Sequence, residues 1–421
     1  MTISEAVVLA AGEGKRLRPL TYTRPKCMIN LAGKPILRHV IENLKEVGVK
    51  RVVIVIGYKK ERILEYFEKI NLGIKIEFVV QKKRYGTAAA FLEARELVNG
   101  TFFGVAGDII TEANVFRKLA NAHCGEITAA LKRIENPEDY GIANLENGRI
   151  VSFEEKPKKP KEGLTNCSIY VFEPSVFKKM EMIKVSPRGE YEVTDLLKDG
   201  NACGVEISDY WLDMGLPWQL FDANRFLLER LPARFGDVEG SIIRGKVYME
   251  KDAKIISSYI EGPLYVGENS VIGPHSYVRG ATSIGANCCI GDSTTVKNSI
   301  VFDSVNAKHL AYIGDSIVGE RCNFGAGVQI ANFRFDESNI KTKVNDVIVD
   351  TKRNKLGAII GDDVKMGVLS SVMPGKMIGN GCWIGANVMV DENVDPNMQL
   401  SIKQELIRRK RSEMSSRRRR V

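Results

Sequence analysis

The chain has 421 residues, 44% of them hydrophobic and 27% charged, a composition typical of a folded protein that is too long for a single hydrophobic core. Its net charge is +9, but residues 408–421 hold eight basic residues and one glutamate, so the rest of the chain is nearly neutral and lacks the charge of a nucleic-acid enzyme. No run of about 18 apolar residues and no signal-peptide pattern are present, which argues against a membrane protein. We interpret residues 401–421 as a basic, solvated tail; contact of this tail with nucleic acid or anionic lipid is the less favoured alternative.

The eight cysteines are scattered along the chain and form no CxxC pair. We therefore expect neither metal binding nor redox chemistry from them. Free thiols suit a reducing compartment, so a cytoplasmic protein is predicted.

The first half alternates apolar, β-rich runs with amphipathic helical segments. Strands alternating with helices at this spacing predict a Rossmann-like α/β fold, in which a mostly parallel sheet binds ligands at the carboxyl ends of its strands. Beyond residue 127 the pattern is richer in strands, with a hairpin signal at Asn147-Gly148, and a helix over 217–231 closes this half. The earlier strands are predicted at 5–10, 50–57, 74–80 and 102–108, and the earlier helices at 35–47, 60–70, 87–98 and 112–123.

The stretch VVLAAGEGKRLRPLTYTRPKCMINLAGKPIL is the most specific signal in the chain. After the first predicted strand it enters a loop with Gly12 and Gly14, which allow backbone N–H groups to approach a phosphate closely. The same segment delivers Arg16 and, ten residues later, Lys26. Fixed cations of this kind neutralise charge on a triphosphate and on its pyrophosphate leaving group, so the segment indicates phosphoryl-type transfer.

This segment resembles the signature of the sugar-1-phosphate nucleotidylyltransferase family, GxGxRLxPLTxxxPKxMxxxxGKP, with Lys15 where many members have Thr or Ser. The resemblance implies that the later stretch QKKRYGTAAA reads the base of a uridine or thymidine nucleotide. Gln81 and the backbone of Gly86 would pair with the pyrimidine edge, and Thr87 belongs to the same nucleotide-binding set. UTP or dTTP is the co-substrate that this resemblance implies.

Two carboxylates match the magnesium positions of that family. Asp108 ends the predicted strand in VAGD, and Asp213 lies in DYWLDMGLPWQL, which resembles the family's WxDxGTP with Leu216 in place of the usual Thr. Mg²⁺ takes oxygen ligands, commonly one or two carboxylates together with substrate phosphate. The resemblance further implies four residues that hold the sugar hydroxyls and the sugar phosphate: Gly141, Glu155, Lys156 and Asn166.

The implied reaction is in-line attack by a sugar-1-phosphate oxygen on the α-phosphorus of UTP or dTTP, with release of pyrophosphate. The attacking phosphate is already anionic, so no general base is needed, and positioning and charge neutralisation carry the catalysis. Glucose-1-phosphate and an N-acetylhexosamine-1-phosphate both stay open as the acceptor.

From about residue 241 the sequence pattern changes to a six-residue repeat. One aliphatic residue per hexad would point inward, while glycine permits the corner backbone, which is the signature of a parallel β-helix. The pattern resembles the left-handed β-helix family, whose members usually form trimers, so a homotrimer is expected. We expect a nucleotidyltransferase domain at 1–231, a linker at 232–240 and the β-helix at 241–400. The repeating positions are Val266, Ile272, Val278, Ile284, Ile290, Val296, Val318, Phe324, Ile330, Ile360, Met366, Val372, Ile378, Ile384 and Val390.

A histidine interrupts this repeat. The stretch KHLAYIGDSIVGERCNFGAGVQIAN resembles the acetyltransferase half of the bacterial bifunctional enzymes that make UDP-N-acetylglucosamine. The resemblance implies that His309 is a general base, which takes a proton from an amino-sugar ammonium before the amine attacks acetyl-CoA. Arg279 and Lys297 align with the phosphate-binding Arg and Lys of that family. The remaining implied contacts to the amino sugar and acetyl-CoA are Tyr312, Asn323, Ala326 and Asn332.

Two departures from that family concern contacts with the cofactor. Phe333 stands where a tyrosine is usual, and Val368 falls near the position of a CoA-contacting serine. Lys341, associated with the insertion-like segment 333–355, is expected to line the same groove.

We therefore predict a bifunctional enzyme that acetylates glucosamine-1-phosphate or galactosamine-1-phosphate and transfers a nucleotidyl group to a sugar-1-phosphate. One alternative is a nucleotidylyltransferase whose column serves only as a trimerising scaffold. A second is a non-catalytic assembly protein similar to the regulatory subunits of the translation-initiation exchange factor. The presence of Arg16, Lys26, Asp108 and Asp213 counts against the second alternative. No nucleic-acid or membrane partner is expected.

Overall fold

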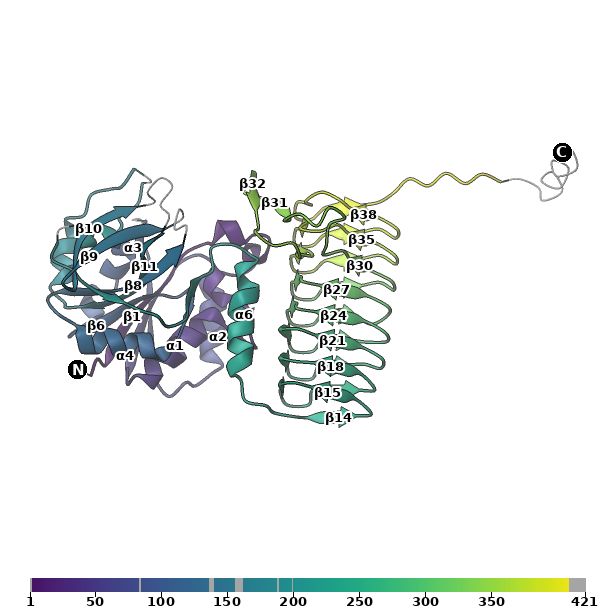
Figure 1. Cartoon of the computed structure of the whole chain (residues 1–421), viewed down its shortest axis with the longest axis horizontal. Helices are drawn as coiled ribbons and strands as arrows, with labels where there is room; N and C mark the ends of the chain where they lie inside the picture. Colours follow the sequence, from purple (N-terminus) through teal and green to yellow (C-terminus); the bar gives the residue numbers. More distant parts are fainter. Residues whose placement is uncertain are drawn as a thin grey trace, which may run out of the picture.

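The computed structural model describes residues 2–82, 85–135, 140–155, 162–187, 189–198 and 200–408. An α/β half and a column of short strands lie side by side, and helix α6 (Gln219–Arg230) runs between them (Figure 1). Among the described residues, none of the helices has both the length and the apolar character needed to cross a bilayer.

The α/β half is built on a nine-stranded sheet with the order β5-β4-β1-β6-β11-β8-β12-β10-β9. The first four of these strands are parallel, and β11 then runs antiparallel to β6. Their buried, β-branched residues pack between helices on both faces, as in a doubly wound fold. The strands are β1 (Glu5–Ala10), β4 (Arg51–Ile56), β5 (Lys75–Val80), β6 (Phe102–Ala106), β8 (Ile127–Glu135), β9 (Gly141–Glu146), β10 (Arg149–Glu155), β11 (Glu162–Phe172) and β12 (Cys203–Glu206).

The predicted helices are present, with one difference in length. The segment expected as a helix over 87–98 forms an α-helix only over Thr87–Leu92 and then a 3₁₀ turn, Arg95–Leu97, because its last turn is closed by the tighter Leu97 N to Ala94 O bond. The predicted hairpin joins β9 and β10, and both Asn147 and Gly148 have positive φ. The other helices are α1 (Ile36–Glu46), α2 (Lys60–Glu68), α4 (Ala113–Ala122) and α5 (Val176–Glu181).

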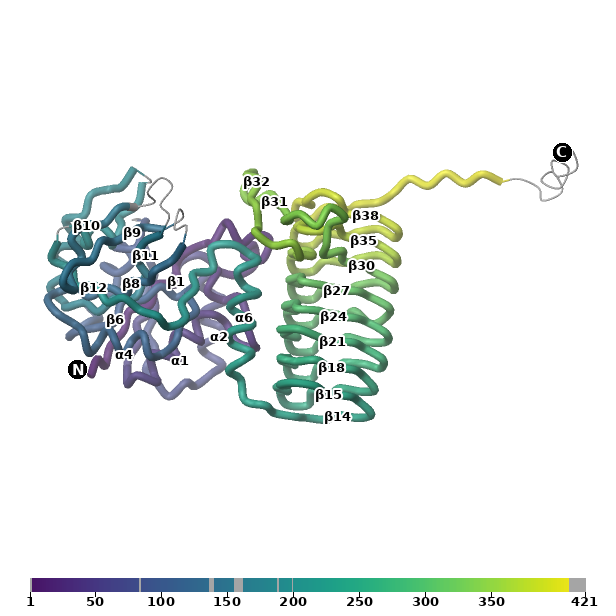
Figure 2. Tube along the Cα trace, viewed as in Figure 1, coloured from purple at the N-terminus to yellow at the C-terminus, as the bar shows by residue number. Residues whose placement is uncertain are grey.

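The second half is a left-handed parallel β-helix with three flat faces, whose coils stack regularly along the column (Figure 2). One face has nine strands from β14 (Asp237–Glu239) to β39 (Gln399–Leu400). The second has eight, from β15 (Ile242–Arg244) to β38 (Met389–Val390), and the third has seven, from β16 (Val247–Met249) to β36 (Met377–Ile378).

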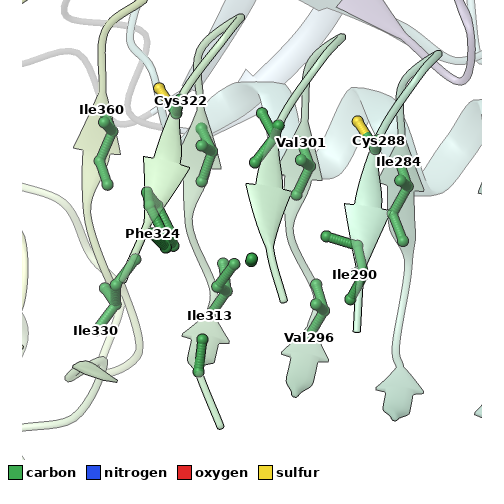
Figure 3. Close-up of a cluster of buried hydrophobic side chains, with 14 of the residues drawn as sticks. Ile284, Cys288, Ile290, Val296, Val301, Ile313, Cys322, Phe324, Ile330 and Ile360 are labelled. Atoms are coloured by element: carbon green, nitrogen blue, oxygen red, sulfur yellow. The ribbon is translucent and has the colours of Figure 1, made fainter. Parts of the chain in front are cut away.

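Every aliphatic position of the predicted six-residue repeat lies in the buried core of this column. The side chains stack in rows down the interior (Figure 3). Between Val296 and Val318 the sequence repeat is irregular, but the structure continues without a gap because Val301, Ala307 and Ile313 fill the inward positions. The column therefore tolerates five-residue steps in its sequence while keeping its core continuous.

One excursion leaves the column between β30 (Gln329–Ile330) and β33 (Ile359–Ile360). Its base is closed by an antiparallel bridge from Phe333 to Lys355, the bounds expected for the insertion. The excursion ends in a hairpin of β31 (Lys341–Val344) and β32 (Val347–Asp350), which reaches toward the α/β half (Figure 1).

The two halves share an apolar core. Side chains of the signature segment, such as Leu20, pack in one cluster with column residues such as Phe302. Asn224 of α6 is fully buried in this interface, where its Oδ1 accepts bonds from Ala32 N at 3.0 Å and from Ser283 Oγ at 2.7 Å. A buried polar group with its partners satisfied fixes how the two halves meet.

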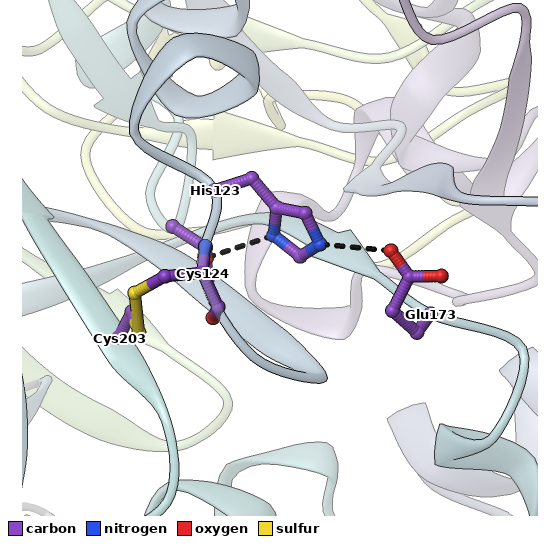
Figure 4. The surroundings of a disulfide bond; sticks show 5 residues. His123, Cys124, Glu173 and Cys203 are labelled. Carbon is purple, nitrogen blue, oxygen red and sulfur yellow. Dashed lines mark hydrogen bonds and ion pairs between the residues drawn. A yellow bond between two sulfur atoms is a disulfide. The ribbon is translucent and has the colours of Figure 1, made fainter. Parts of the chain in front are cut away.

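The expectation that all cysteines are free thiols is wrong for one pair. Cys124 and Cys203, which are 79 residues apart in sequence, form a disulfide at the start of β12 (Figure 4). His123 lies beside it, with Nδ1 2.9 Å from Thr128 Oγ1 and Nε2 3.0 Å from Glu173 Oε1. The pair escapes sequence analysis because the register of β12 on β8, which puts Cys203 opposite Thr128, brings the two cysteines together.

Candidate active sites

Two carboxylates meet at the carboxyl edge of the parallel strands. β1 and β6 are adjacent and parallel, so their ends lie at one edge, and Asp108 is the second residue after the end of β6. The short strand β13 (Trp211–Asp213) pairs antiparallel with β7 (Ile109–Thr111), which puts Asp213 opposite Ile109 and therefore beside Asp108.

The ammonium group of Lys26 lies between these two carboxylates. Its Nζ is 2.8 Å from Asp108 Oδ2 and 2.8 Å from Asp213 Oδ1, and its side chain is only 12% exposed. Burial by itself lowers the pKa of Lys26, but the charges and hydrogen bonds of the two carboxylates outweigh this effect and raise the pKa above the ordinary lysine value. Lys26 is therefore a fixed cation at this edge.

The glycine loop brings Arg16 to the same place. Gly14 has φ of 70°, a conformation that favours glycine, and the 3₁₀ turn Lys15–Leu17 follows it. The Arg16 guanidinium is so close to Gly215, two residues after Asp213, that a Cβ at that glycine would lie 3.2 Å from Arg16 Nη2. Gly12 is exposed, and a Cβ there would have open space around it. Lys26 and the two carboxylates thus form one cluster, and Arg16 lies near it, beside Gly215.

The predicted base-reading residues gather at the end of β5. Gln81 follows this strand, and its Nε2 lies 3.4 Å from Gly86 O. Gly86 has φ of 115° and packs against Tyr191, whose backbone oxygen a Cβ would approach to 2.3 Å. Thr87 Oγ1 accepts a bond from Val193 N at 2.9 Å. The position and conformation of this turn are therefore set by the chain around residues 191–193.

The predicted sugar-side residues lie on neighbouring strands. Gly141 begins β9 and is paired in register with Glu155 at the end of β10. Gly141 O accepts a bond from Thr165 Oγ1 at 3.2 Å, and the next residue on β11, Asn166, donates from Nδ2 to Tyr170 Oη at 2.6 Å. Lys156 lies outside the described residues.

On the column, the predicted phosphate-binding residues are direct neighbours. β21 (Tyr277–Arg279) and β24 (Thr295–Lys297) are parallel, and their register pairs Arg279 with Lys297, at a strand spacing of about 4.8 Å. Lys297 Nζ is 2.8 Å from Asp315 Oδ2. Within the part of the chain that the structure describes, the buried Nε of Arg279 has no hydrogen-bond partner, and its guanidinium lies over the Tyr277 ring, with Cζ 5.3 Å from the ring centroid.

Asp315 organises the polar groups around this pair, and sequence reasoning missed it. It is only 4% exposed, and its Oδ1 accepts from Asn298 Nδ2 at 2.8 Å while its Oδ2 accepts from Asn332 Nδ2. Tyr312 and Asn332 both reach Gly314, where a Cβ would meet the tyrosine hydroxyl at 2.6 Å and the amide nitrogen at 2.8 Å. The available signal was the aspartate that ends the YIGD stretch of the motif.

His309 lies exposed at a corner of the column, where its carbonyl accepts a bond from Gly327 N at 3.1 Å. Ala326 belongs to the next coil at the same corner, and Asn323 precedes it on the neighbouring face, the nine-stranded one. The predicted acetyl-transfer residues thus flank one edge of the column: Arg279 and the groups around Asp315 on one face, Asn323 on the other.

Lys341 is not part of this group. It lies on the hairpin and lines a cleft of about 710 Å³ between the column and the signature segment, together with Lys15 and Arg18. None of the other predicted acetyl-transfer residues lines this cleft.

Comparisons with known proteins match both halves. A nucleotidyl transferase family model covers residues 5–230. A model of the GMPPB C-terminal domain covers 260–373, and one of the hexapeptide repeat of succinyl-transferase covers 357–392.

Curated relatives match nearly the whole chain. A Methanocaldococcus jannaschii protein described as bifunctional protein GlmU is 39% identical over 96% of this chain and 99% of its own length. A Sulfurisphaera tokodaii protein described as a bifunctional sugar-1-phosphate nucleotidylyltransferase/acetyltransferase is 38% identical over 93% of this chain and 98% of its own length. The low-salt glycan biosynthesis nucleotidyltransferase Agl11 of Haloferax volcanii is 32% identical over 76% of this chain and 94% of its own length.

Proposed function

This chain belongs to the family of bifunctional sugar-1-phosphate nucleotidylyltransferases and acetyltransferases, and we propose that each of its halves catalyses one of the two transfers. The α/β half, taken as 1–231, moves a uridylyl or thymidylyl group from UTP or dTTP to a sugar-1-phosphate. The column, taken as 241–400 after a linker at 232–240, moves an acetyl group from acetyl-CoA to an amino-sugar-1-phosphate. The observation that carries this proposal is that each half holds its own cluster of fixed charges, around Lys26 in the first and around Asp315 in the second.

In the nucleotidylyl transfer, an oxygen of the sugar phosphate attacks the α-phosphorus of the nucleotide. The bond from the α-phosphorus to the bridging oxygen breaks as the new bond forms, and pyrophosphate leaves with the displaced electron pair. The nucleophile needs no base, so Arg16 and Lys26 act by holding positive charge where the reacting phosphates gather. Lys26 suits this task because its carboxylate partners hold it in place and keep it protonated.

The two carboxylates also fit Mg²⁺. Asp108 and Asp213 would hold the ion, since their oxygens already converge on one cationic atom, Nζ of Lys26. Mg²⁺ commonly takes one or two protein carboxylates and completes its shell with substrate phosphate and water. When bound, the ion supplies charge neutralisation on the triphosphate.

For the nucleotide and the sugar, we assign the roles that the family resemblance implies. Gln81 and the Gly86 backbone read the pyrimidine, with Thr87 beside them, and Gly12 and Gly14 admit the phosphates. The sugar-1-phosphate is held by Gly141, Glu155, Lys156 and Asn166. Glucose-1-phosphate and N-acetylhexosamine-1-phosphates are the acceptors to compare.

In the acetyl transfer, His309 removes a proton from the ammonium of glucosamine-1-phosphate or galactosamine-1-phosphate. The free amine attacks the thioester carbonyl, the new C–N bond forms, and the CoA thiolate leaves with the electrons of the C–S bond. The nitrogen then gives up its second proton, which the thiolate takes up to form the free thiol of CoA. Arg279 and Lys297 hold the 1-phosphate, and their pairing in register on neighbouring strands, which puts two cations side by side, supports this role. Tyr312, Asn323, Ala326 and Asn332 supply the remaining contacts to the amino sugar and acetyl-CoA.

We propose that the active form is a homotrimer in the cytoplasm, where its co-substrates are available. His309 stands on a convex edge, and the neighbouring side chains Leu310 and Leu369 are 60% and 63% exposed. An edge cannot enclose a substrate, so a second column beside it would complete the groove. Lys341 is proposed to join this groove from the hairpin of a neighbouring subunit.

One substrate panel tests the proposal. UTP and dTTP are each combined with glucose-1-phosphate, N-acetylglucosamine-1-phosphate and N-acetylgalactosamine-1-phosphate, and pyrophosphate is measured; glucosamine-1-phosphate and galactosamine-1-phosphate are then incubated with acetyl-CoA, and free thiol is measured. Both products are expected. Pyrophosphate without thiol would favour a column that only trimerises, and the absence of both would favour a non-catalytic assembly protein.

A further inference from the structure

The signature segment is held from two sides, and the second side is the column. Arg24 precedes Lys26 by two residues but its guanidinium enters the interface between the halves, where Arg24 is only 4% exposed. Its Nη1 lies 2.9 Å from Glu320 Oε1, and its Nη2 pairs with Asp362 Oδ2. Both carboxylates belong to the β-helix.

Asp362 is fully buried and uses both of its oxygens. Oδ2 accepts from Thr23 Oγ1 at 2.6 Å as well as from Arg24, and Oδ1 accepts from the backbone N of Glu320 at 2.8 Å. The Phe302 ring covers the guanidinium, with 5.0 Å between Arg24 Cζ and the ring centroid. A planar guanidinium held by two carboxylates and a ring has little freedom to move.

Only Pro25 separates this anchor from Lys26. Proline fixes its own φ, here at −69°, so the backbone cannot rotate about this bond. A displacement of Arg24 therefore displaces Lys26 as well. On its other side Lys26 meets Asp108 and Asp213. The segment from Thr23 to Lys26 thus joins a buried ion pair in the column to the charge cluster of the α/β half.

We propose that Arg24, with Asp362 and Glu320, is a positioning residue for nucleotidylyl transfer, so that the β-helix supplies part of the support of the first active site. This inference rests on the proposed nucleotidylyl transfer. A purely structural role would predict that loss of the ion pair lowers only the stability of the protein. The positioning role predicts that kcat falls even at temperatures where the variant is fully folded.

The sequence offers a matched control at the next residue. Asp363 forms a similar carboxylate–guanidinium pair, with Oδ1 2.7 Å from Arg321 Nε and Oδ2 2.9 Å from Arg321 Nη2, but it is 50% exposed and forms no bond to Arg24. Arg321 also donates to Glu320 Oε2 at 2.7 Å, so this control disturbs a neighbour of the anchor and leaves the Arg24–Asp362 pair in place. Asp362→Asn and Asp363→Asn therefore make the same chemical change, but only Asp362 is bonded to the segment that holds Lys26.

The full-length variants are compared in pyrophosphate release, acetyl transfer, thermal unfolding and hydrogen–deuterium exchange of the peptide that spans residues 19–28. For Asp362→Asn we expect kcat of nucleotidylyl transfer to fall about 10- to 100-fold, with nucleotide KM changed less than about threefold. Acetyl transfer should stay within about twofold, and the peptide should exchange faster. Asp363→Asn should match the wild type in all four measurements.

A second variant guards against misfolding of the first. Thr23→Val removes one hydrogen bond from Asp362 and leaves the buried charges paired, so we expect a folded protein whose unfolding temperature falls by only a few degrees and whose kcat falls about two- to fivefold. The proposal is overturned if the two aspartate variants have equal kcat, or if Thr23→Val matches the wild type after Asp362→Asn fails to fold. If the wild type releases no pyrophosphate, the proposed nucleotidylyl transfer is wrong. If the hydrogen–deuterium exchange of the peptide 19–28 is unchanged in Asp362→Asn, the positioning inference is wrong whether or not the enzyme is active.

Discussion

Gly14 packs directly against the side chain of Lys26. A Cβ at position 14 would lie 2.8 Å from the Lys26 Cβ, a distance that real side chains essentially never show, and Gly14 also has φ of 70°. Its lack of a side chain therefore serves two ends: it permits the left-handed turn and it leaves room for the lysine that faces Asp108 and Asp213.

Gly14→Ala should impair nucleotidylyl transfer specifically. The left-handed conformation costs an L-residue about 1–2 kcal/mol, and the added methyl group must push Lys26 away from its partners. We expect kcat for pyrophosphate release to fall about 100-fold, while acetyl transfer is retained. Gly100→Ala is the control, since a Cβ there meets open space and its φ is not positive. Equal rates in the two variants would contradict this account of Gly14.

Asp213→Asn should weaken the use of Mg²⁺. The amide keeps the shape of the side chain but removes one of the two negative charges beside Lys26. We expect a higher Mg²⁺ concentration for half-maximal pyrophosphate release and a kcat about 100-fold lower. Acetyl transfer has no need of this carboxylate and should be unchanged. A wild-type Mg²⁺ titration in the variant would show that Asp213 is no ligand.

His309→Asn should abolish acetyl transfer and leave nucleotidylyl transfer intact. Loss of a general base costs about 10²- to 10⁴-fold in rate. Thiol release from acetyl-CoA measures the first activity and pyrophosphate the second. His275→Asn is the matched control, because His275 is another exposed histidine of the column, at a position with φ of 58° that asparagine accepts well. If His309→Asn retains full thiol release, another group is the base.

Stability should depend on pH through His39 of α1. Burial lowers its pKa to about 4, although its Nε2 contact to Leu31 O at 3.0 Å works in the opposite direction. The unfolded chain protonates near pH 6.5, so the free energy of unfolding is undiminished above that pH and decreases as the pH falls toward 4. Urea denaturation should give a value up to about 2 kcal/mol lower at pH 5 than at pH 7 from this residue. His39→Gln, which keeps a side-chain donor, should reduce this difference between the two pH values. If the difference is unchanged in the variant, other titrating groups cause it.

Reduction of the Cys124–Cys203 disulfide should lower stability. Its partners are 79 residues apart, and closing a loop of that length in the unfolded chain stabilises the folded state by about 4 kcal/mol. The Cys124→Ser/Cys203→Ser variant should unfold at a lower temperature than the wild type, with both transfer rates at 25 °C within about twofold. Cys289→Ser, at a free cysteine of the column, should leave the unfolding temperature unchanged. Equal unfolding temperatures would refute the stabilising role.

The elements that the sequence predicts well are those encoded locally. Val7 and Val8 lie in an apolar run that forms β1, and the six-residue spacing of residues such as Ile284 and Ile290 puts each of them in the column core. These predictions are confirmed because the spacing of apolar side chains along a single strand or coil determines which of its faces is buried. The irregular stretch from Val301 to Ile313 shows the limit, because there the core is continued by stacking on neighbouring coils and not by the period.

The candidate sites divide in the same way. The types and order of Arg16, Lys26, Asp108 and Asp213 follow from the sequence motif, whereas the contact of Lys26 with both carboxylates depends on the pairing of β13 with β7. For acetyl transfer, the motif names His309 and Arg279, but only the register of three column strands reveals Asp315 at the centre of the polar groups.

By itself, then, the sequence determined the two architectures, their order and the chemical groups available to each, because these depend on short-range periodicity and on residue type. The tertiary structure alone decided which distant groups meet: Cys124 with Cys203, Lys26 with Asp213, and Arg24 with Asp362. These contacts join residues whose sequence separation carries no periodic signal. They form because the burial of apolar surface brings distant segments together, and a charged or polar group that is buried in this way costs free energy unless it is paired.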